Sequence, residues 1–360
     1  MKKRIFALLV AAAMMAPMLI LAGCDTRETI NVYNWGEYIS NGDDGSLDVN
    51  AEFTRRTGIR VNYTTYDTNE DMYQKIKNGA ADYDIIIPSD YMIEKMVNEG
   101  MLERLDFSNI PNVQYIGDEY KNLPFDPGGL YSVAYAWGTV GIIYNKTMVD
   151  AADVAEQSWS ILWNEKYAGD ILMFSPKNPR DNFGVALKML GYSQNSLNPG
   201  EWLEAAAALS AQKPLVQAYV MDEVFGKMEG DNAALAVYYA GDAYTMMESN
   251  PNLGFFIPKE GSNHFVDAIC IPMGSKNKSA AEKYIDFLCD PEIALANIEY
   301  INYSTPNTAA YDELDEEVKS DPNFYPPASV LDRCDIFHDL SLEIYTLQNE
   351  LWTEIMTQSA

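Results

Sequence analysis

Strand-like and helix-like patterns alternate through the first hundred residues, and this alternation is the strongest constraint on the fold. The strand patterns occupy residues 30–34, 59–63 and 84–88. A helical pattern follows each of them, and the three end at Gly58, Gly79 and Gly100. Alternating strands and helices predict an open, mostly parallel sheet. In such sheets ligands bind beyond the carboxyl ends of the strands.

A second α/β unit follows in the middle of the chain. Further strand patterns lie at residues 142–144, 169–173, 234–239 and 266–272, with a helix at about 182–191. Helical patterns dominate the remaining residues. A chain of 360 residues exceeds what one hydrophobic core usually supports. We therefore predict two α/β lobes with a ligand cleft between them, the plan of a hinged solute receptor.

The N-terminus carries the signature of export. Basic residues at positions 2–4 precede an apolar run at 6–21, which ends in Leu-Ala-Gly-Cys at residues 21–24. This pattern is typical of a secretory signal, and its last four residues resemble a bacterial lipobox. We predict a signal peptide at residues 1–23, a lipid on Cys24, a tether at 24–28, and anchoring on the extracytoplasmic side of the membrane. An uncleaved anchor helix is the alternative.

The charge of the mature chain limits its partners. Removing three basic residues with the signal leaves 22 basic and 53 acidic residues, hence 22 − 53 = −31. Such a chain repels nucleic acid and anionic lipid surfaces, and it attracts cations. Cys334 and His338 stand four residues apart, but no other Cys/His cluster supports a metal site. We expect no metal, no cofactor and no catalytic residue.

Aromatic and acidic side chains recur together near the ends of the predicted strands. The groups are Trp35, Glu37 and Tyr38; Asp181; Tyr239 and Asp242; Phe265 and Asp267; and Tyr303. Carboxylates bind ammonium groups through charge-assisted hydrogen bonds, while aromatic rings cover methylene chains and attract cations. This combination suits a polyamine. Asp267 is the residue on which most depends, and we expect it to be solvated in an open cleft when no ligand is bound.

Several segments resemble the PotD-type family, the spermidine/putrescine-binding proteins of bacterial polyamine ABC importers. They are residues 33–38 (YNWGEY), 64–70 (TTYDTNE), 87–91 (IPSDY), 121–127 (KNLPFDP), 158–163 (SWSILW) and 303–307 (YSTPN). The resemblance implies two discontinuous lobes joined by crossover strands. The implied N-lobe is 29–141 plus 267–308, and the implied C-lobe is 142–266 plus 309–360.

The same resemblance implies a ligand pocket and partners. The pocket residues would be Trp35, Glu37, Tyr38, Ser89, Tyr91, Asp181, Tyr239, Asp242, Phe265, Asp267 and Tyr303. The protein would act as a monomer that delivers spermidine or putrescine to a membrane permease. Asn178, Tyr239 and Phe265 depart from the common spermidine pattern, in which an Asp and two Trp are usual, and Asp242 resembles the putrescine-preferring branch. The preferred amine therefore stays open.

Two other functions remain as alternatives. Tyr238 and Tyr239 resemble the paired phenolate ligands of a ferric-iron receptor, although the segment at 33–38 makes no sense as an iron site. Paired acids in an aromatic cleft also occur in glycosidases, but no motif in this chain fixes a nucleophile or a general base.

Overall fold

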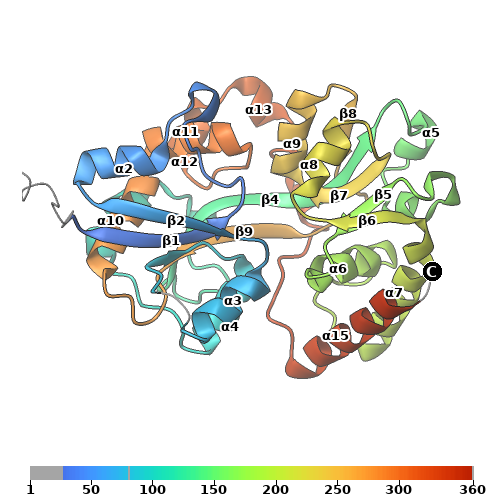
Figure 1. The fold of residues 1–360 in the computed structure, drawn as a ribbon, viewed down its shortest axis with the longest axis horizontal. Helices are drawn as coiled ribbons and strands as arrows, with labels where there is room; N and C mark the ends of the chain where they lie inside the picture. Colours follow the sequence, from blue (N-terminus) through green and yellow to red (C-terminus); the bar gives the residue numbers. More distant parts are fainter. Residues whose placement is uncertain (1–26, 80–81, 359–360) are drawn as a thin grey trace, which may run out of the picture.

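The structure is a computed structural model that describes residues 27–79 and 82–358, so the signal and Cys24 lie outside the described residues. Two twisted sheets are joined through one long strand, β4 (Ser132–Asn145), and helices cover them on both sides (Figure 1). The strand order is β2-β1-β3-β9-β4-β7-β5-β6, and β8 pairs with β4 outside this path. The predicted α/β class with two lobes is confirmed.

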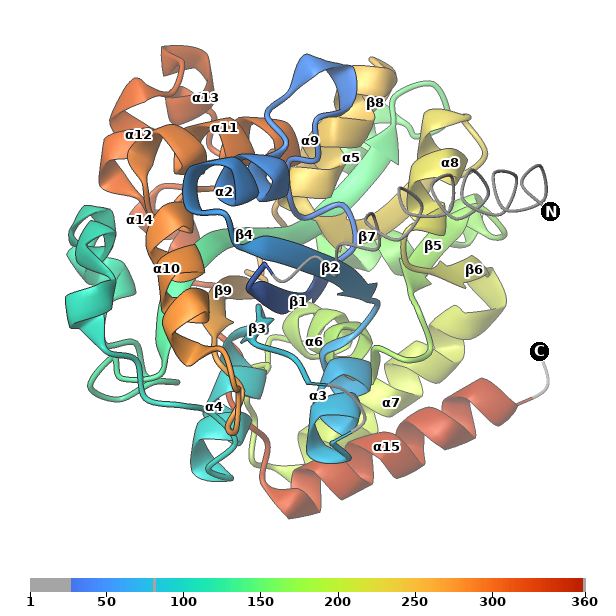
Figure 2. The ribbon, with the colours of Figure 1, turned by 60° about the vertical axis from the view of Figure 1, so that its left-hand side comes forward.

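The first sheet carries the predicted alternation of strands and helices. Its strands are β1 (Thr29–Trp35), β2 (Arg60–Tyr66), β3 (Ile85–Ile86), β9 (His264–Cys270) and the first part of β4. The helices around it are α2 (Val49–Thr57), α3 (Asn69–Lys77), α4 (Asp90–Asn98), α10 (Lys278–Leu288), α11 (Pro291–Ile301), α12 (Thr308–Glu313) and α13 (Glu316–Ser320). Helices α2 and α11 lie on one side of this sheet, and α3 and α4 lie on the other (Figure 2).

The second sheet is built from the middle of the chain. Its strands are the last part of β4 with β5 (Ile171–Phe174), β6 (Val216–Val220), β7 (Leu235–Tyr239) and β8 (Leu253–Phe256). Its helices are α5 (Ala151–Val154), α6 (Pro179–Met189), α7 (Pro199–Gln212), α8 (Glu223–Glu229), α9 (Ala240–Ser249), α14 (Ala328–Leu331) and α15 (Leu342–Thr357). Short 3₁₀ turns connect the elements at 43–45, 107–109, 111–115, 118–120, 159–163, 165–167 and 213–215.

Two antiparallel strands, β4 and β9, run from one sheet toward the other. Residues 132–139 of β4 pair with β9, whereas residues 140–144 pair with β7. The sequence pattern at 142–144 is therefore only the end of a 14-residue strand. Strand β9 begins two residues before the predicted start, so Asp267 lies within the strand rather than at its beginning. Parallel pairing is kept where helices connect the strands, in β1 with β2 and β3 and in β5 with β6 and β7.

The buried side chains form separate cores on the two sides of this junction. One core, here called the N-lobe, spans Ile30 to Trp137 and Phe265 to Leu314. The other side, here called the C-lobe, contains a core from Val140 to Ile257 and a smaller one around Phe183, Trp202 and Trp352. The core of each lobe draws on distant parts of the sequence. The residue boundaries that the resemblance implies for the two lobes stay a prediction.

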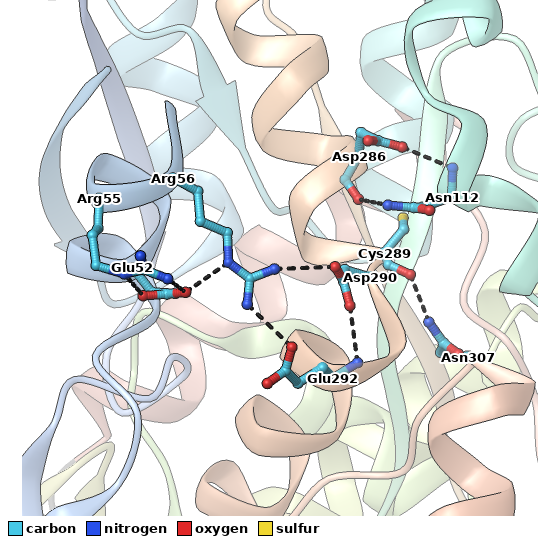
Figure 3. Close-up of polar contacts among 9 residues, drawn as sticks. All are labelled: Glu52, Arg55, Arg56, Asn112, Asp286, Cys289, Asp290, Glu292 and Asn307. Carbon is cyan, nitrogen blue, oxygen red and sulfur yellow. Dashed lines mark hydrogen bonds and ion pairs between the residues drawn. The ribbon is translucent and has the colours of Figure 1, made fainter. Parts of the chain in front are cut away.

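Local signals in the sequence account for several helix ends. The Thr68 hydroxyl accepts a hydrogen bond from the Asp71 backbone N–H at 3.1 Å, which caps the start of α3. Gly58 ends α2 with a φ of 76°, a conformation that glycine adopts without steric cost. Glu52 pairs with Arg56 one helical turn later at 2.6 Å, and Arg56 also reaches Asp290 at the start of α11 (Figure 3).

Among the described residues, none of the helices combines the length and apolar character that a membrane crossing needs. The three cysteines in this part of the chain are free, with Cys270 and Cys289 buried and Cys334 half-buried.

Candidate ligand-binding site

A pocket lies between the lobes at their junction. Its lining draws on both lobes and on the crossing strand β9. The lining residues are Trp35, Gly36, Tyr38, Tyr66, Asp67, Thr68, Asn69, Glu70, Ser89, Asp90, Tyr91, Asn178, Asp181, Met221, Asp222, Tyr238, Tyr239, Asp242, Asn263, Phe265, Asp267, Tyr303 and Phe337. A pocket between two lobes can enclose a small ligand when the lobes close around it.

The carboxyl end of β1 holds Trp35 at the pocket wall. The indole N–H of Trp35 donates to the Ile87 carbonyl at 2.9 Å, and the Tyr66 hydroxyl donates to the same oxygen at 2.6 Å. The rings of Trp35 and Tyr66 lie 4.6 Å apart. Because both rings are fixed by hydrogen bonds, this wall offers a ligand a rigid aromatic surface.

Asp267 on β9 occupies the wall between the lobes. It is only 5% exposed, and its Oδ2 accepts a hydrogen bond from the Tyr38 hydroxyl at 2.7 Å. Its Oδ1 is buried and has no hydrogen-bond partner among the described residues. Burial raises the pKa of Asp267 to about 6. The expectation of a solvated acid is therefore wrong, because β9 runs through the interior and carries Asp267 with it.

The start of α4 contributes three lining residues, Ser89, Asp90 and Tyr91. The Tyr91 hydroxyl donates to Glu70 Oε1 at 3.0 Å, and burial raises the pKa of Glu70 to about 7. Asp90 is fully buried and accepts a hydrogen bond from the Val266 N–H at 3.3 Å, and burial raises its pKa well above the usual range. This wall of the pocket therefore contains two acids, Glu70 and Asp90, whose ionised forms are poorly solvated.

The C-lobe wall is formed by the starts of α6 and α9. Asn178 caps α6, and its amide contacts the Tyr239 hydroxyl at 3.4 Å. Withdrawal from water raises the pKa of the neighbouring Asp181 to about 6. The Tyr239 ring packs edge-on against Phe265 at 5.5 Å. Asn178 has a structural role as the cap of this helix, and this role does not require a carboxylate.

Asp242 marks another acidic part of the pocket, near Tyr303. The Tyr303 hydroxyl donates to Asp242 Oδ2 at 2.9 Å, and burial raises the pKa of Asp242 to about 7. Asp222 and Glu37 are exposed and close enough to raise this pKa further by charge repulsion. The loop that carries Tyr303 is held by Asn307, whose side-chain amide donates to the Cys289 carbonyl at 2.9 Å (Figure 3).

Negative charge in the pocket lacks a protein counter-ion. The described lining contains no Lys or Arg, and its acids are Asp67, Glu70, Asp90, Asp181, Asp222, Asp242 and Asp267. Arg180 lies next to Asp181 but outside the lining, and its guanidinium donates to the Gln194 carbonyl at 2.7 Å. A ligand with several positive charges would neutralise these carboxylates, whereas an anion would be repelled.

All the predicted pocket residues except Glu37 are part of this lining. Glu37 is exposed and has a positive φ of 47° in the turn after β1, so its side chain remains near the acids without lining the pocket. Sequence reasoning did not select Glu70, Asp67, Asp90 or Asp222. Asp67 and Asp90 lie in segments that the sequence pattern places at strand ends, whereas Asp222 follows β6 (Val216–Val220), a strand absent from the prediction.

Comparisons with known proteins agree with this geometry. A family model described as bacterial extracellular solute-binding protein matches residues 49–326. The spermidine/putrescine-binding periplasmic protein of Escherichia coli (strain K12) is 37% identical over 327 residues, which cover 90% of each chain. A putrescine/cadaverine-binding protein of Pseudomonas aeruginosa is 31% identical over 97% of this chain and 98% of its own.

A solved structure has the same architecture. The spermidine/putrescine ABC transporter substrate-binding protein PotD from Streptococcus pneumoniae superposes with a TM-score of 0.77 and 40% sequence identity, covering 91% of this chain and 98% of that one.

Proposed function

Because this chain belongs to the bacterial extracellular solute-binding protein family, we propose that it binds spermidine and putrescine and delivers them to an ABC importer. The observation that carries the proposal is the pocket between the lobes, with seven acidic residues and no basic residue in its described lining. Relatives named for spermidine, putrescine or cadaverine support the same ligand class.

The pocket suggests how such a ligand is held. One ammonium group would bind at Asp267, whose Oδ1 awaits a donor, with Asp181 and Glu70 nearby. Another would bind beside Asp242. The rings of Trp35 and Tyr239 would cover the methylene chain between them, excluding water and adding cation–π attraction of about 0.5–2 kcal/mol per good contact. Binding and release require no covalent step, so we propose a receptor and not an enzyme.

The location and the partners belong to the same proposal. The protein would be held on the extracytoplasmic face of the membrane by a lipid on Cys24 and would act as a monomer. Lobe closure would present the loaded form to a permease. The names of the Escherichia, Pseudomonas and Streptococcus relatives mention spermidine, putrescine or cadaverine. None of these three names mentions iron or a glycosidase.

Titration calorimetry of the protein beginning at residue 25 tests the proposal. Putrescine, spermidine, spermine, Fe³⁺ and maltose are titrated separately at pH 8, where most pocket acids are ionised. We expect both putrescine and spermidine to bind, with spermidine modestly preferred. Binding of Fe³⁺ or maltose without amine binding would overturn the assignment. Putrescine binding more than tenfold tighter than spermidine would show that the acids are matched to a diamine.

A further inference from the structure

Residues 335–339 cross between the lobes beside the pocket and are anchored to the C-lobe. The Arg180 guanidinium on α6 donates to Asn195 Oδ1 at 2.8 Å and lies 3.4 Å from the His338 carbonyl. The same Asn195 oxygen accepts from the His338 N–H at 2.9 Å, and its amide donates to the Ile336 carbonyl at 2.7 Å. Because Arg180 and Asn195 hold its backbone on both sides, this segment moves with the C-lobe.

The same segment is bound by helix α4 of the N-lobe. Glu94 Oε2 accepts a hydrogen bond from the Asp339 N–H at 2.8 Å and lies 3.2 Å from His338 Nδ1. Lys95 reaches Asp339 Oδ1 at 3.6 Å, and its ammonium lies 5.7 Å from the centre of the Tyr345 ring at the start of α15. The contacts of Glu94 and Lys95 therefore span the two lobes and would break if the lobes separated.

This contact lies one helical turn from the pocket. Tyr91 lines the pocket and stands three residues before Glu94 on α4, so the two side chains lie on neighbouring positions of one helix face. On the opposite side, Phe337 also lines the pocket, and its ring lies 6.0 Å from that of Tyr91. A ligand that contacts Tyr91 and Phe337 thus touches both elements that Glu94 ties together.

We propose that Glu94 is a positioning residue that keeps the lobes closed over the bound ligand. The inference rests on the proposed function, since it needs a ligand to be retained, but Glu94 itself does not line the pocket. A carboxylate that accepts a backbone N–H forms a stronger hydrogen bond than a neutral acceptor. Only 25% of the Glu94 side chain is exposed, so solvent screens this bond less than it screens a surface pair.

A second contact across the cleft provides a comparison. Lys177 in the loop before α6 pairs with Asp71 on α3 at 3.0 Å, but their side chains are 60% and 49% exposed. Exposed ion pairs contribute little free energy. The Glu94 contact should therefore affect ligand retention much more than the Lys177 pair, although both span the lobes.

The test compares ligand dissociation rates in variants of two glutamates. Spermidine and putrescine binding is followed by stopped-flow tryptophan fluorescence for the wild type, Glu94→Ala, Glu94→Gln and the control Glu103→Ala. Glu103 also accepts a backbone N–H, from Gly274 at 3.0 Å, and its side chain is 24% exposed, but its partners Gly274 and Lys278 both belong to the N-lobe. Glu94→Ala should dissociate about tenfold faster with little change in the association rate, because the hydrogen bond that it lacks forms only when the lobes are closed.

The control and the conservative variant separate this role from a structural one. Glu94→Gln keeps an acceptor for the Asp339 N–H, so its dissociation rate should fall between those of Glu94→Ala and wild type, whereas Glu103→Ala and Asp71→Asn should dissociate at nearly the wild-type rate. Small-angle scattering with saturating spermidine should show a larger radius of gyration for Glu94→Ala than for wild type. Wild-type rates in both Glu94 variants would overturn the role of Glu94, whereas a wild type that binds neither amine would overturn the proposed function itself.

Discussion

The pocket acids are held where their own charge is unfavourable. Asp267 and Asp181 have pKa values raised to about 6, and Glu70 and Asp242 to about 7, in each case mainly by burial. A buried, ionised acid lowers the folding stability of the unliganded protein. It raises the affinity for a cation, because the cation compensates the carboxylate for its lost hydration. Ligand binding and ligand-free stability should therefore respond in opposite directions to the loss of one acid.

Asp267→Asn tests this opposition directly. It keeps the size and one acceptor for the Tyr38 hydroxyl but removes the charge. At pH 8 we expect a loss of about 2–5 kcal/mol in spermidine binding, or roughly 30-fold or more in affinity. The unliganded protein should become more stable, by up to about 3 kcal/mol, because the variant buries a neutral amide where the wild type buries an ionised carboxylate. Calorimetry and urea unfolding measure the two effects.

The control is Asp315→Asn, which neutralises an exposed acid before α13 whose side chain makes no capping bond. It should leave both quantities close to wild type. Equal affinities for the two variants would show that Asp267 does not bind an ammonium group.

Trp35→Ala removes one wall of the pocket. We expect the affinity for spermidine to fall by ~1–3 kcal/mol, from lost apolar burial and lost cation–π attraction. Calorimetry on a variant with a wild-type circular dichroism spectrum measures the loss. An unchanged affinity would mean that the Trp35 indole, held by the Ile87 carbonyl, only packs against Tyr66.

Residue types near strand ends were the part of the site that the sequence could reveal. Trp35 stands out because rings and acids gather at the carboxyl end of a predicted strand, whereas Tyr303 lies in the loop that follows helix α11. Glu37 is absent from the lining, because its position depends on the positive φ of the turn after β1 and not on composition; its role in binding stays a prediction. Asp222 lies just after the carboxyl end of β6 (Val216–Val220) and precedes α8, but this strand was not among the predicted ones, so the strand-end signal was missed.

At the scale of elements, the site is assembled from the ends of strands and the first turns of helices. Phe265 and Asp267 on strand β9 both line the pocket. Helix α9 begins directly after Tyr239, the last residue of β7. Gly241 in the first turn of α9 is in contact with the Tyr303 ring, so close that an added Cβ would lie 2.3 Å from a ring carbon. This glycine is needed for the approach of two elements and not for its backbone conformation.

Gly241→Ala should therefore displace Tyr303 from Asp242 and weaken spermidine binding. Forcing a methyl group into packed space costs about 1–3 kcal/mol. Gly226 in α8 is the matched control, because nothing lies within 4 Å of its added Cβ. Gly226→Ala should raise stability by up to about 1 kcal/mol through helix propensity. Thermal unfolding and calorimetry of both variants give the comparison, and a Gly241→Ala protein with wild-type stability and affinity would contradict it.

Periodicity predicted most of the N-lobe elements, because strands β1 to β3 and helices α2 to α4 each have a clear pattern. A glycine or a capping residue marks one end of each of these helices. The long strand β4 was recognised only at residues 142–144. Residues 132–141 are almost entirely buried, with neither alternation nor helical period, so only their pairing with β9 and β7 identifies them. The pairing that joins the two lobes is a tertiary property.

At the scale of the whole molecule, two lobes and a large negative charge serve one task. The lobes meet across a pocket that lacks basic side chains among its described lining, and the rest of the chain adds a field that attracts cations. Salt screens that field beyond about 8 Å, so it should speed the approach of an amine more than it strengthens binding. Retention depends on the short-range contacts inside the closed pocket.

Cys24→Ser tests the proposed attachment of the molecule to the membrane. Cys24 lies outside the described residues, and the prediction depends on the Leu-Ala-Gly-Cys segment alone. We expect an unprocessed or released protein in place of an acylated, membrane-bound one, because serine offers no thiol for acylation. Cell fractionation with palmitate labelling measures the change. Acylated, membrane-held protein in the variant would contradict the assignment.

The pH dependence of stability follows from the pocket acids taken together. Their pKa values in the folded protein, about 6 to 7, exceed the unfolded values of 3.8 for Asp and 4.5 for Glu. Between about pH 4 and pH 7 the ligand-free folded state therefore binds more protons than the unfolded state, and its stability falls as the pH rises through this window. We expect the midpoint of thermal unfolding without ligand to be higher at pH 5 than at pH 8.

Spermidine should reverse this trend, because its ammonium groups stabilise the ionised carboxylates and displace their protons. The increase in unfolding midpoint caused by spermidine should be small at pH 5, where protons compete with the amine, and large at pH 8. Calorimetry at pH 6 in two buffers of different ionisation enthalpy should detect proton release on binding, and at pH 8.5 much less. Proton uptake, or a stabilisation by spermidine that is equal at pH 5 and pH 8, would mean that the acids with raised pKa values are not the groups that bind the amine.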